Sequence, residues 1–156
     1  MLRPIVETTT VERTVLVPIR CALEVFKAMT MHNSVVASHR LAETMRAYAL
    51  GLPEAFEDHP WGENVAKVGK KVFVFFGMPE AEQPFGLTVK LPDSYDMAMS
   101  LPWAKNPGYR MDRGHWVWLQ PPEDAPLDML TEWITESYRA VAPKRLVGSL
   151  DPQPEA

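Results

Sequence analysis

The residues best suited to chemistry lie in one short segment, residues 54–63, which holds four carboxylates and one histidine. Paired carboxylates can act as acid and base, and a carboxylate beside an imidazole can hold a divalent metal ion. Side chains alternate between faces along an extended segment, so Glu57 and His59 could meet whereas Asp58 would point away. An enzyme that uses Glu57 and His59 is therefore one hypothesis for this chain.

A structural interpretation of the same segment is favoured over catalysis. Two ligands are too few for a catalytic metal, and the other histidines do not recur at ligand spacing. In the structural interpretation Phe56 and Trp61 pack into the core, while the acids form caps or salt bridges. We therefore predict no metal site.

Signatures of other enzyme classes are missing from the sequence. No Gly-x-Ser-x-Gly nucleophile motif occurs, and no glycine-rich loop matches a P-loop or a dinucleotide site. Cys21 is the only cysteine, which excludes an internal disulfide and a multi-thiolate zinc site. We expect a non-catalytic protein without a cofactor.

A basic and aromatic group of residues is the remaining candidate site. Residues 67–118 hold seven Lys and Arg against five Asp and Glu, although the whole chain has a net charge of −4. Cations on hairpins and loops can neutralise phosphates, and aromatic side chains such as Trp103 and Tyr109 can stack on exposed bases. The predicted phosphate contacts are Lys67, Lys70, Lys71, Lys90, Arg110 and Arg113. The opposing interpretation is that these lysines are ordinary solvated strand edges.

The alternative, from a different functional class, is a domain that binds a small anionic ligand in a pocket or interacts with another protein. A lysine in a partly apolar cleft could bind an anionic metabolite. The residues that could line such a pocket are Glu57, His59, Trp61, Lys67, Lys90 and Trp116. Convergence of the two lysines in a cleft would favour this pocket, and their spread over a ridge would favour nucleic acid.

Composition places the chain among soluble globular domains. It has 156 residues, 46% of them hydrophobic and 23% charged, which fits one domain and excludes wholesale disorder. Its 15 prolines predict many breaks between short elements. No run approaches the roughly 18 apolar residues of a membrane span. We expect a cytoplasmic protein with no membrane partner.

The order of elements predicts an α+β two-layer sandwich. Ser38 is a plausible N-cap for a helix over residues 39–50, and residues 65–76 predict a hairpin with its turn at Gly69 and Lys70. Strands are expected at 87–91 and 115–119, where Trp116 and Trp118 share a face that we assign to the core. Helices are expected after Pro92 and from Pro126 onward. Hairpin-linked strands make an antiparallel sheet, with the helices packed on one face.

The chain is expected to comprise one domain between two less regular ends. Residues 1–37 predict an accessory extension, with a short amphipathic helix at 19–29 as an option. Residues 38–147 form the domain, and residues 148–156 predict a flexible tail.

Several segments of this domain resemble the MmcQ/YjbR family. The stretch 47–63, with its Glu-Asp-x-Pro-Trp-Gly block, is similar to the opening of the family. Residues 65–73 are similar to the family's first hairpin, and residues 87–92 to its strand that ends in Lys-x-Pro. Residues 114–117 and 136–141 are similar to its closing strand and to its Ser-Tyr helix. The resemblance spans about residues 39–147.

The resemblance implies a frataxin-like (CyaY-like) α+β sandwich, which is also compared with a double-wing DNA-binding module. It therefore implies a DNA-binding or regulatory protein, with wings at Lys67–Lys71 and around Lys90, Arg110 and Arg113. Frataxin binds iron through an acidic first helix. Here residues 39–50 offer only Glu43 against two arginines, so iron binding is not expected.

Overall fold

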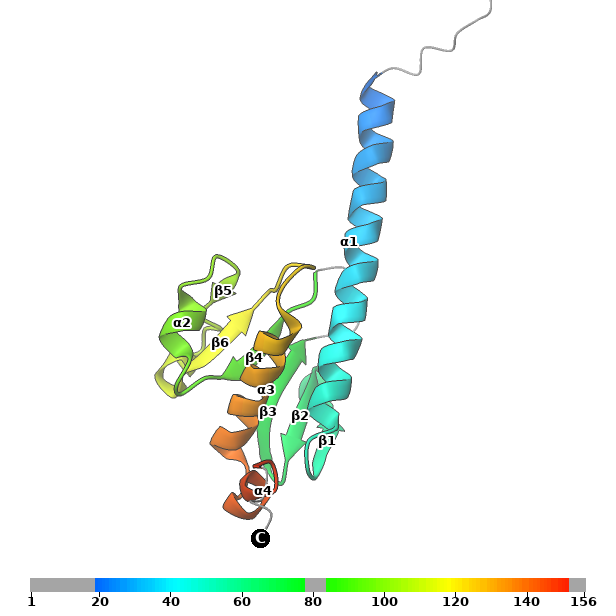
Figure 1. Cartoon of the computed structure of the whole chain (residues 1–156). Coiled ribbons are helices and arrows are strands. Elements are labelled where there is room, and N and C mark those ends of the chain that lie inside the picture. The colour runs from blue at the N-terminus through cyan, green and yellow to red at the C-terminus, as the bar shows by residue number, and fades with distance from the viewer. Residues whose placement is uncertain (1–18, 78–83, 152–156) are drawn as a thin grey trace, which may run out of the picture. The chain divides into compact units, whose positions relative to one another are not determined.

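The structure, a computed structural model, describes residues 19–77 and 84–151 (Figure 1). The chain divides into two compact units, Met1–His32 and Asn33–Ala156. The predicted extension and tail lie partly outside the described residues, at 1–18 and 152–156.

The first described element is one long helix, α1 (Ile19–Leu50). The prediction that a helix starts at Ser38 is therefore wrong. No Gly or Pro interrupts residues 19–50, so nothing ends the helix before Gly51. The Ser38 hydroxyl does not cap a helix; it accepts a hydrogen bond from the backbone N–H of Phe85 at 2.6 Å.

The fold is α+β, with a six-stranded antiparallel sheet in the order β1-β2-β3-β4-β6-β5. The strands are β1 (Ala55–Asp58), β2 (Asn64–Val68), β3 (Lys71–Gly77), β4 (Leu87–Lys90), β5 (Ala104–Lys105) and β6 (Trp116–Leu119). The predicted hairpin between β2 and β3 is confirmed, including its turn at Gly69 and Lys70. The sheet contains two strands, β1 and β5, that the sequence did not predict.

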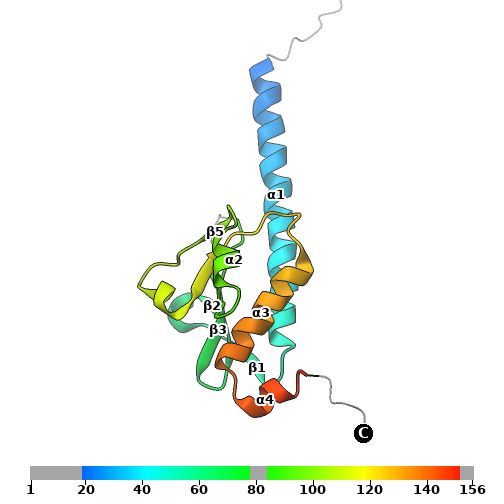
Figure 2. The ribbon, with the colours of Figure 1, turned by 60° about the vertical axis from the view of Figure 1, so that its left-hand side comes forward.

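Helices cover one face of this sheet. After α1 come α2 (Tyr95–Met99), α3 (Leu127–Val141) and α4 (Lys144–Gly148), with the short 3-10 helices η1 (Pro60–Gly62) and η2 (Met111–Gly114) in loops. Met45 of α1 and Ile134 of α3 join one buried cluster with Val89 and Val117 of the sheet. The Tyr48 hydroxyl lies 2.7 Å from Thr135 Oγ1, so the end of α1 lies beside α3 (Figure 2).

Alternation along the strands decides which side chains face the helices. In β6, Val117 and Leu119 are fully buried in the core cluster, so Trp116 and Trp118 point to the other face, where both are partly exposed. The prediction that the two tryptophans are core residues is wrong. Both faces of β6 are apolar, and hydrophobicity alone could not tell which face was buried.

The prediction that Phe56 and Trp61 pack into the core is also wrong. Phe56 lies opposite Lys67 of β2 and is 44% exposed on the face away from the helices. Trp61 is 87% exposed, because it occupies the turn η1 between β1 and β2 in a left-handed conformation with φ +58°. Neither ring belongs to the buried cluster.

Three consecutive residues of α3 tie separate segments to this helix. Glu136 Oε1 accepts hydrogen bonds from the backbone N–H groups of Asp93 and Ser94, at 2.8 and 3.0 Å. The buried Ser137 hydroxyl donates to the carbonyl of Phe73 and accepts from the N–H of Lys90. The hydroxyl therefore links β3 to β4 just beyond Val74–Val89, the last paired residues of the two strands at this end.

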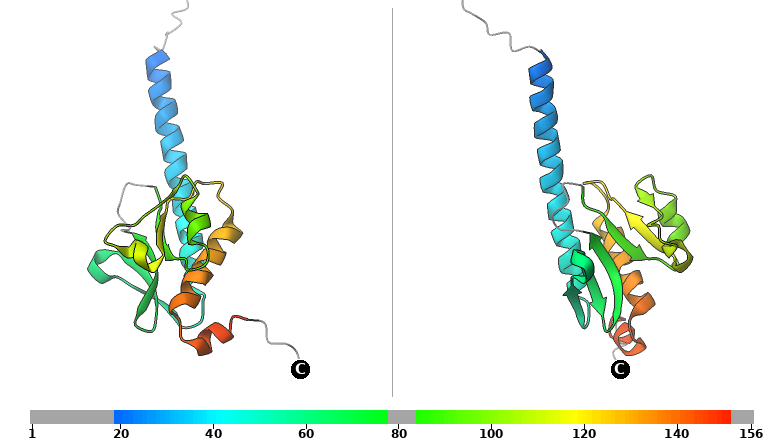
Figure 3. Two further views of the ribbon diagram at one scale, coloured as in Figure 1. Left: turned by 90° about the vertical axis from the view of Figure 1, so that its left-hand side faces the viewer. Right: turned by 180° about the vertical axis from the view of Figure 1, so that it is seen from behind.

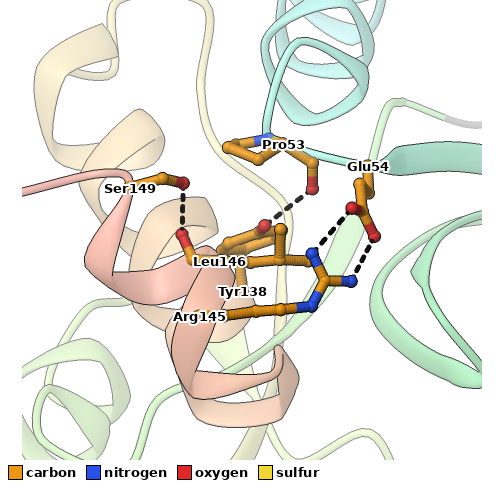
Figure 4. Close-up of polar contacts among 6 residues, drawn as sticks. All are labelled: Pro53, Glu54, Tyr138, Arg145, Leu146 and Ser149. Atoms are coloured by element: carbon orange, nitrogen blue, oxygen red, sulfur yellow. Dashed lines mark hydrogen bonds and ion pairs between the residues drawn. The ribbon is translucent and has the colours of Figure 1, made fainter.

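The third of these residues, Tyr138, fixes the start of β1 (Figure 4). Its hydroxyl donates to the carbonyl of Pro53 at 2.7 Å, and burial raises the pKa of this phenol. Beside it, Arg145 makes two hydrogen bonds to Glu54, at 2.8 and 2.9 Å. The guanidinium lowers the pKa of the Glu54 carboxyl. These contacts hold Pro53 and Glu54 against the last turn of α3 and the first turn of α4.

Candidate nucleic-acid interface

Strand pairing brings five of the six predicted cations to one end of the sheet. Val74 pairs with Val89, so the start of β3 and the end of β4 lie at the same end. Lys90 pairs with Trp116, so the start of β6 and the preceding η2 also lie at this end of the sheet. We call this end, formed by residues 69–71, 90–93 and 110–115, the hairpin end. It contains Lys70, Lys71, Lys90, Arg110 and Arg113.

These five cations have no charged partner in the described structure. Four of them are exposed and Lys90 is partly exposed. Among residues 19–77 and 84–151, none of the five side chains forms an ion pair or a hydrogen bond. The hairpin end holds two acids, Asp93 and Asp112, against the five cations, in a chain with a net charge of −4. These segments therefore carry a surplus of three positive charges, with the Glu136 carboxylate of α3 beside them, 2.8 Å from the Asp93 N–H.

The sixth predicted cation, Lys67, is neutralised within the fold. Its ammonium group lies 2.9 Å from Asp58 Oδ2 and 5.8 Å from the centre of the Phe56 ring. The ion pair with Lys67 is the main cause of a lowered pKa of the Asp58 carboxyl, and a hydrogen bond from the backbone N–H of His59 adds to it. Lys67 therefore has less charge to offer a ligand than the other five.

The loop before β6 holds an aromatic side chain entirely outward. Gly108, Tyr109 and Arg110 all have left-handed backbones, with φ of +81°, +50° and +59°. Asn106 Oδ1 supports the turn by accepting a hydrogen bond from the Gly108 N–H at 2.9 Å. Tyr109 is 98% exposed beside Arg110. Non-glycine residues adopt this conformation at a cost, and such strain is found more often at functional sites.

The sheet face away from the helices carries aromatic and cationic side chains. We call it the open face. In the view from behind, the strands lie in front of α3 (Figure 3). Phe75 and Trp116 meet there edge to face, with ring centres 5.5 Å apart. Lys105 Nζ lies 5.8 Å from the centre of the Trp118 ring. The charged and aromatic residues of the open face are Phe56, Asp58, Lys67, Phe75, Lys90, Lys105, Trp116 and Trp118. Phe75 was not among the predicted site residues, although period-two spacing places it on the face opposite the buried Val74.

The residues of the predicted anion pocket do not gather in one place. Lys67, Lys90 and Trp116 share the open face. Glu57, however, faces the helices, where its carboxylate lies 2.5 Å from Arg46, and this contact raises the pKa of the guanidinium. Trp61 follows β1, whose last residue pairs with Val65, so it lies at the opposite end of the sheet from Lys90.

The predicted pair of Glu57 and His59 is not joined in the structure. His59 is exposed beyond the end of β1, and no hydrogen bond or ion pair connects it with Glu57. Within the described part of the chain, no three His, Cys, Asp or Glu side chains come together as a metal site requires. None of the described helices combines the length and hydropathy of a membrane span.

Comparison with known proteins identifies the family. No curated protein matches the chain. The crystal structure of Deinococcus radiodurans protein DR2400, with domain DUF419, is similar: the two are 25% identical with a TM-score of 0.53, over 66% of this chain and 79% of that one. The YjbR family model matches residues 50–140, which include the hairpin end, the open face and the Glu136–Tyr138 bridges. The chain therefore belongs to the YjbR family.

Proposed function

We propose that this protein is a non-catalytic, cytoplasmic nucleic-acid-binding protein that contacts phosphates through the hairpin end. The observation that carries the proposal is the grouping of five unpaired cations on an otherwise acidic chain. They come from three segments far apart in sequence and meet through strand pairing. Lysine and arginine that neutralise phosphates release counterions, which is the main source of sequence-independent affinity.

The hairpin end suits phosphate contacts better than base reading in a groove. Arg110 and Arg113 can each bind a phosphate with two parallel hydrogen bonds, while Lys70 and Lys71 act as point charges. Of the described helices near this end, α2 has five residues and η2 has four, and the longer α3 is packed on the sheet, where its Ser137 hydroxyl accepts from the Lys90 N–H. Recognition helices lie in the major groove with several side chains on base edges. The proposal is therefore binding without strong sequence preference.

The alternative of an anionic-ligand pocket has less support. Lys67 already has Asp58 as its partner, and Glu57 and Trp61 point elsewhere. The open face does keep Lys90 beside Trp116, and that pair enters the inference below.

The experiment is a fluorescence-anisotropy titration of labelled DNA at several salt concentrations. Five phosphate contacts on duplex DNA predict a slope of log affinity against log salt near −4.5, which is roughly 500-fold weaker binding for a fourfold rise in salt. Arg113→Ala should make the slope shallower by about one unit. Arg40→Ala is the matched control, since Arg40 is an exposed arginine of α1. It should leave the slope unchanged. Absence of binding even at low salt would refute the proposal.

A further inference from the structure

We propose that the open face binds single-stranded nucleic acid by stacking unpaired bases on its aromatic side chains. This inference rests on the proposed function and narrows its substrate class. It is carried by the alternation of aromatic rings and lysines on a face that no described helix covers.

The rings form a platform across three neighbouring strands. Phe75 of β3 and Trp116 of β6 touch across β4, and Trp118 lies two residues further along β6. Two residues of a strand span about 7 Å, so the two indoles can serve successive bases. All three rings are partly exposed. Stacking on such rings tolerates any sequence, because every base has a π face.

Lysines lie among these rings, and the open face has little opposing charge. Lys90 is the register partner of Trp116, and Lys105 is the partner of Trp118. The described strands place one carboxylate on this face, Asp58, and Lys67 neutralises it. The unpaired charge of the open face is therefore positive, and it continues through Lys90 into the hairpin end. A strand of phosphates alternating with bases has the complementary pattern.

Glycine backbones hold the two indoles in position. A Cβ on Gly114 would lie 3.0 Å from Trp116 Cδ1, and a Cβ on Gly86 would lie 3.0 Å from Trp118 Cζ2. Neither glycine has a positive φ, so close approach of the ring accounts for the lack of a side chain there. A platform that is already in place loses little conformational freedom when a base stacks on it.

Duplex DNA fits this face poorly. Its bases are stacked inside the helix, and its major groove admits an α-helix or a two-stranded ribbon. A broad sheet cannot enter a groove, whereas unpaired bases can lie across a sheet and stack on its aromatic residues. Single strands should therefore use the open face and the hairpin end together, and duplexes only the hairpin end.

The test compares a labelled oligothymidine with a duplex of equal length at the same salt concentration. The full chain should bind the single strand at least about tenfold more tightly. Trp118→Ala should weaken single-strand binding by roughly 5- to 150-fold and leave duplex binding unchanged. Trp61→Ala is the matched control, because this exposed tryptophan lies at the other end of the sheet. It should change neither affinity.

The outcomes separate this inference from the proposed function. Equal binding of both nucleic acids, unchanged in Trp118→Ala, overturns the inference and leaves phosphate binding at the hairpin end intact. Absence of binding to either nucleic acid overturns both. Should Trp118→Ala unfold by circular dichroism, Lys105→Gln replaces it, since Lys105 is exposed. It should reduce the salt slope for the single strand by about 0.7; an unchanged slope would count against the open face.

Discussion

Ser137→Ala is expected to destabilise the fold strongly, although it removes a single oxygen atom. Ser137 is fully buried, and its hydroxyl is the partner of both the Phe73 carbonyl and the Lys90 N–H. Alanine would leave these two backbone groups without this hydrogen-bond partner. Each orphaned buried group costs about 1–3 kcal/mol.

The net loss should be about 2–4 kcal/mol. Two orphaned groups cost roughly 2–6 kcal/mol, and the better helix propensity of alanine offsets about 0.5 kcal/mol. Partial closure of β3 onto β4 should keep the value in the lower half of that range, because Val74 and Val89 already pair next to the bridge. At about 4 °C per kcal/mol for a domain of this size, the melting temperature should fall by roughly 8–16 °C.

Denaturant unfolding of the unaltered protein and of Ser137→Ala measures the loss of stability, and equal m-values check that both unfold in the same way. Ser100→Ala is the matched control: its hydroxyl is exposed and donates only to the carbonyl of Met97, so the change should stay within about 0.5 kcal/mol. Hydrogen exchange supplies a local readout, since the Lys90 amide should lose protection in Ser137→Ala alone. If Ser137→Ala were as stable as Ser100→Ala and its Lys90 amide stayed protected, the stabilising role of the Ser137 hydroxyl would be refuted.

Three further perturbations follow from the contacts of the fold. Tyr138→Phe should cost about 1 kcal/mol in denaturant unfolding, because it removes only the hydrogen bond to Pro53 and keeps the ring. The pKa values of Glu54 and Asp58 are lowered in the folded protein. Their ionised carboxylates therefore stabilise the fold fully at a pH above the unfolded pKa values near 4, and this stabilisation is lost as the pH falls through the lower pKa values of the folded state. Melting temperatures should therefore drop below pH ~4, and less so in Glu54→Gln. Trp61→Ala should change the unfolding free energy by less than about 0.5 kcal/mol, since its ring is 87% exposed; a larger loss would mean that the ring packs in solution.

The sequence predicted the elements whose periodicity is strong. The β2–β3 hairpin and the helix after Pro126 were found because long apolar patterns and a tight glycine turn mark them. β1 has only two apolar residues, Ala55 and Phe56, followed by two acids, and β5 has two residues in all, so neither shows the alternation of a strand. The start of α1 was misplaced because Ser38 resembles an N-cap residue. Its hydrogen-bond partner is Phe85, which lies 47 residues away in the sequence.

The candidate site was only partly predictable, because strand order assembles it. Lys71, Lys90 and Arg113 were chosen from their chemistry, but their position at one end follows from which strands pair. The neutralisation of Lys67 by Asp58 could not be foreseen without β1, which aligns the two segments. The face of Trp118 was ambiguous because its neighbours in β6 are equally apolar.

The residues that carry the family resemblance chiefly hold the fold together. Glu136, Ser137 and Tyr138 bind backbone groups of three other segments, and Asp58 of the Glu-Asp-x-Pro-Trp-Gly block binds Lys67. Such residues specify how the strands and helices meet, and with them the positions at the hairpin end and on the open face. They do not specify which side chains occupy those positions. Membership of the family therefore fixes the scaffold, whereas binding must be decided residue by residue, at Arg113 for phosphate and at Trp118 for unpaired bases.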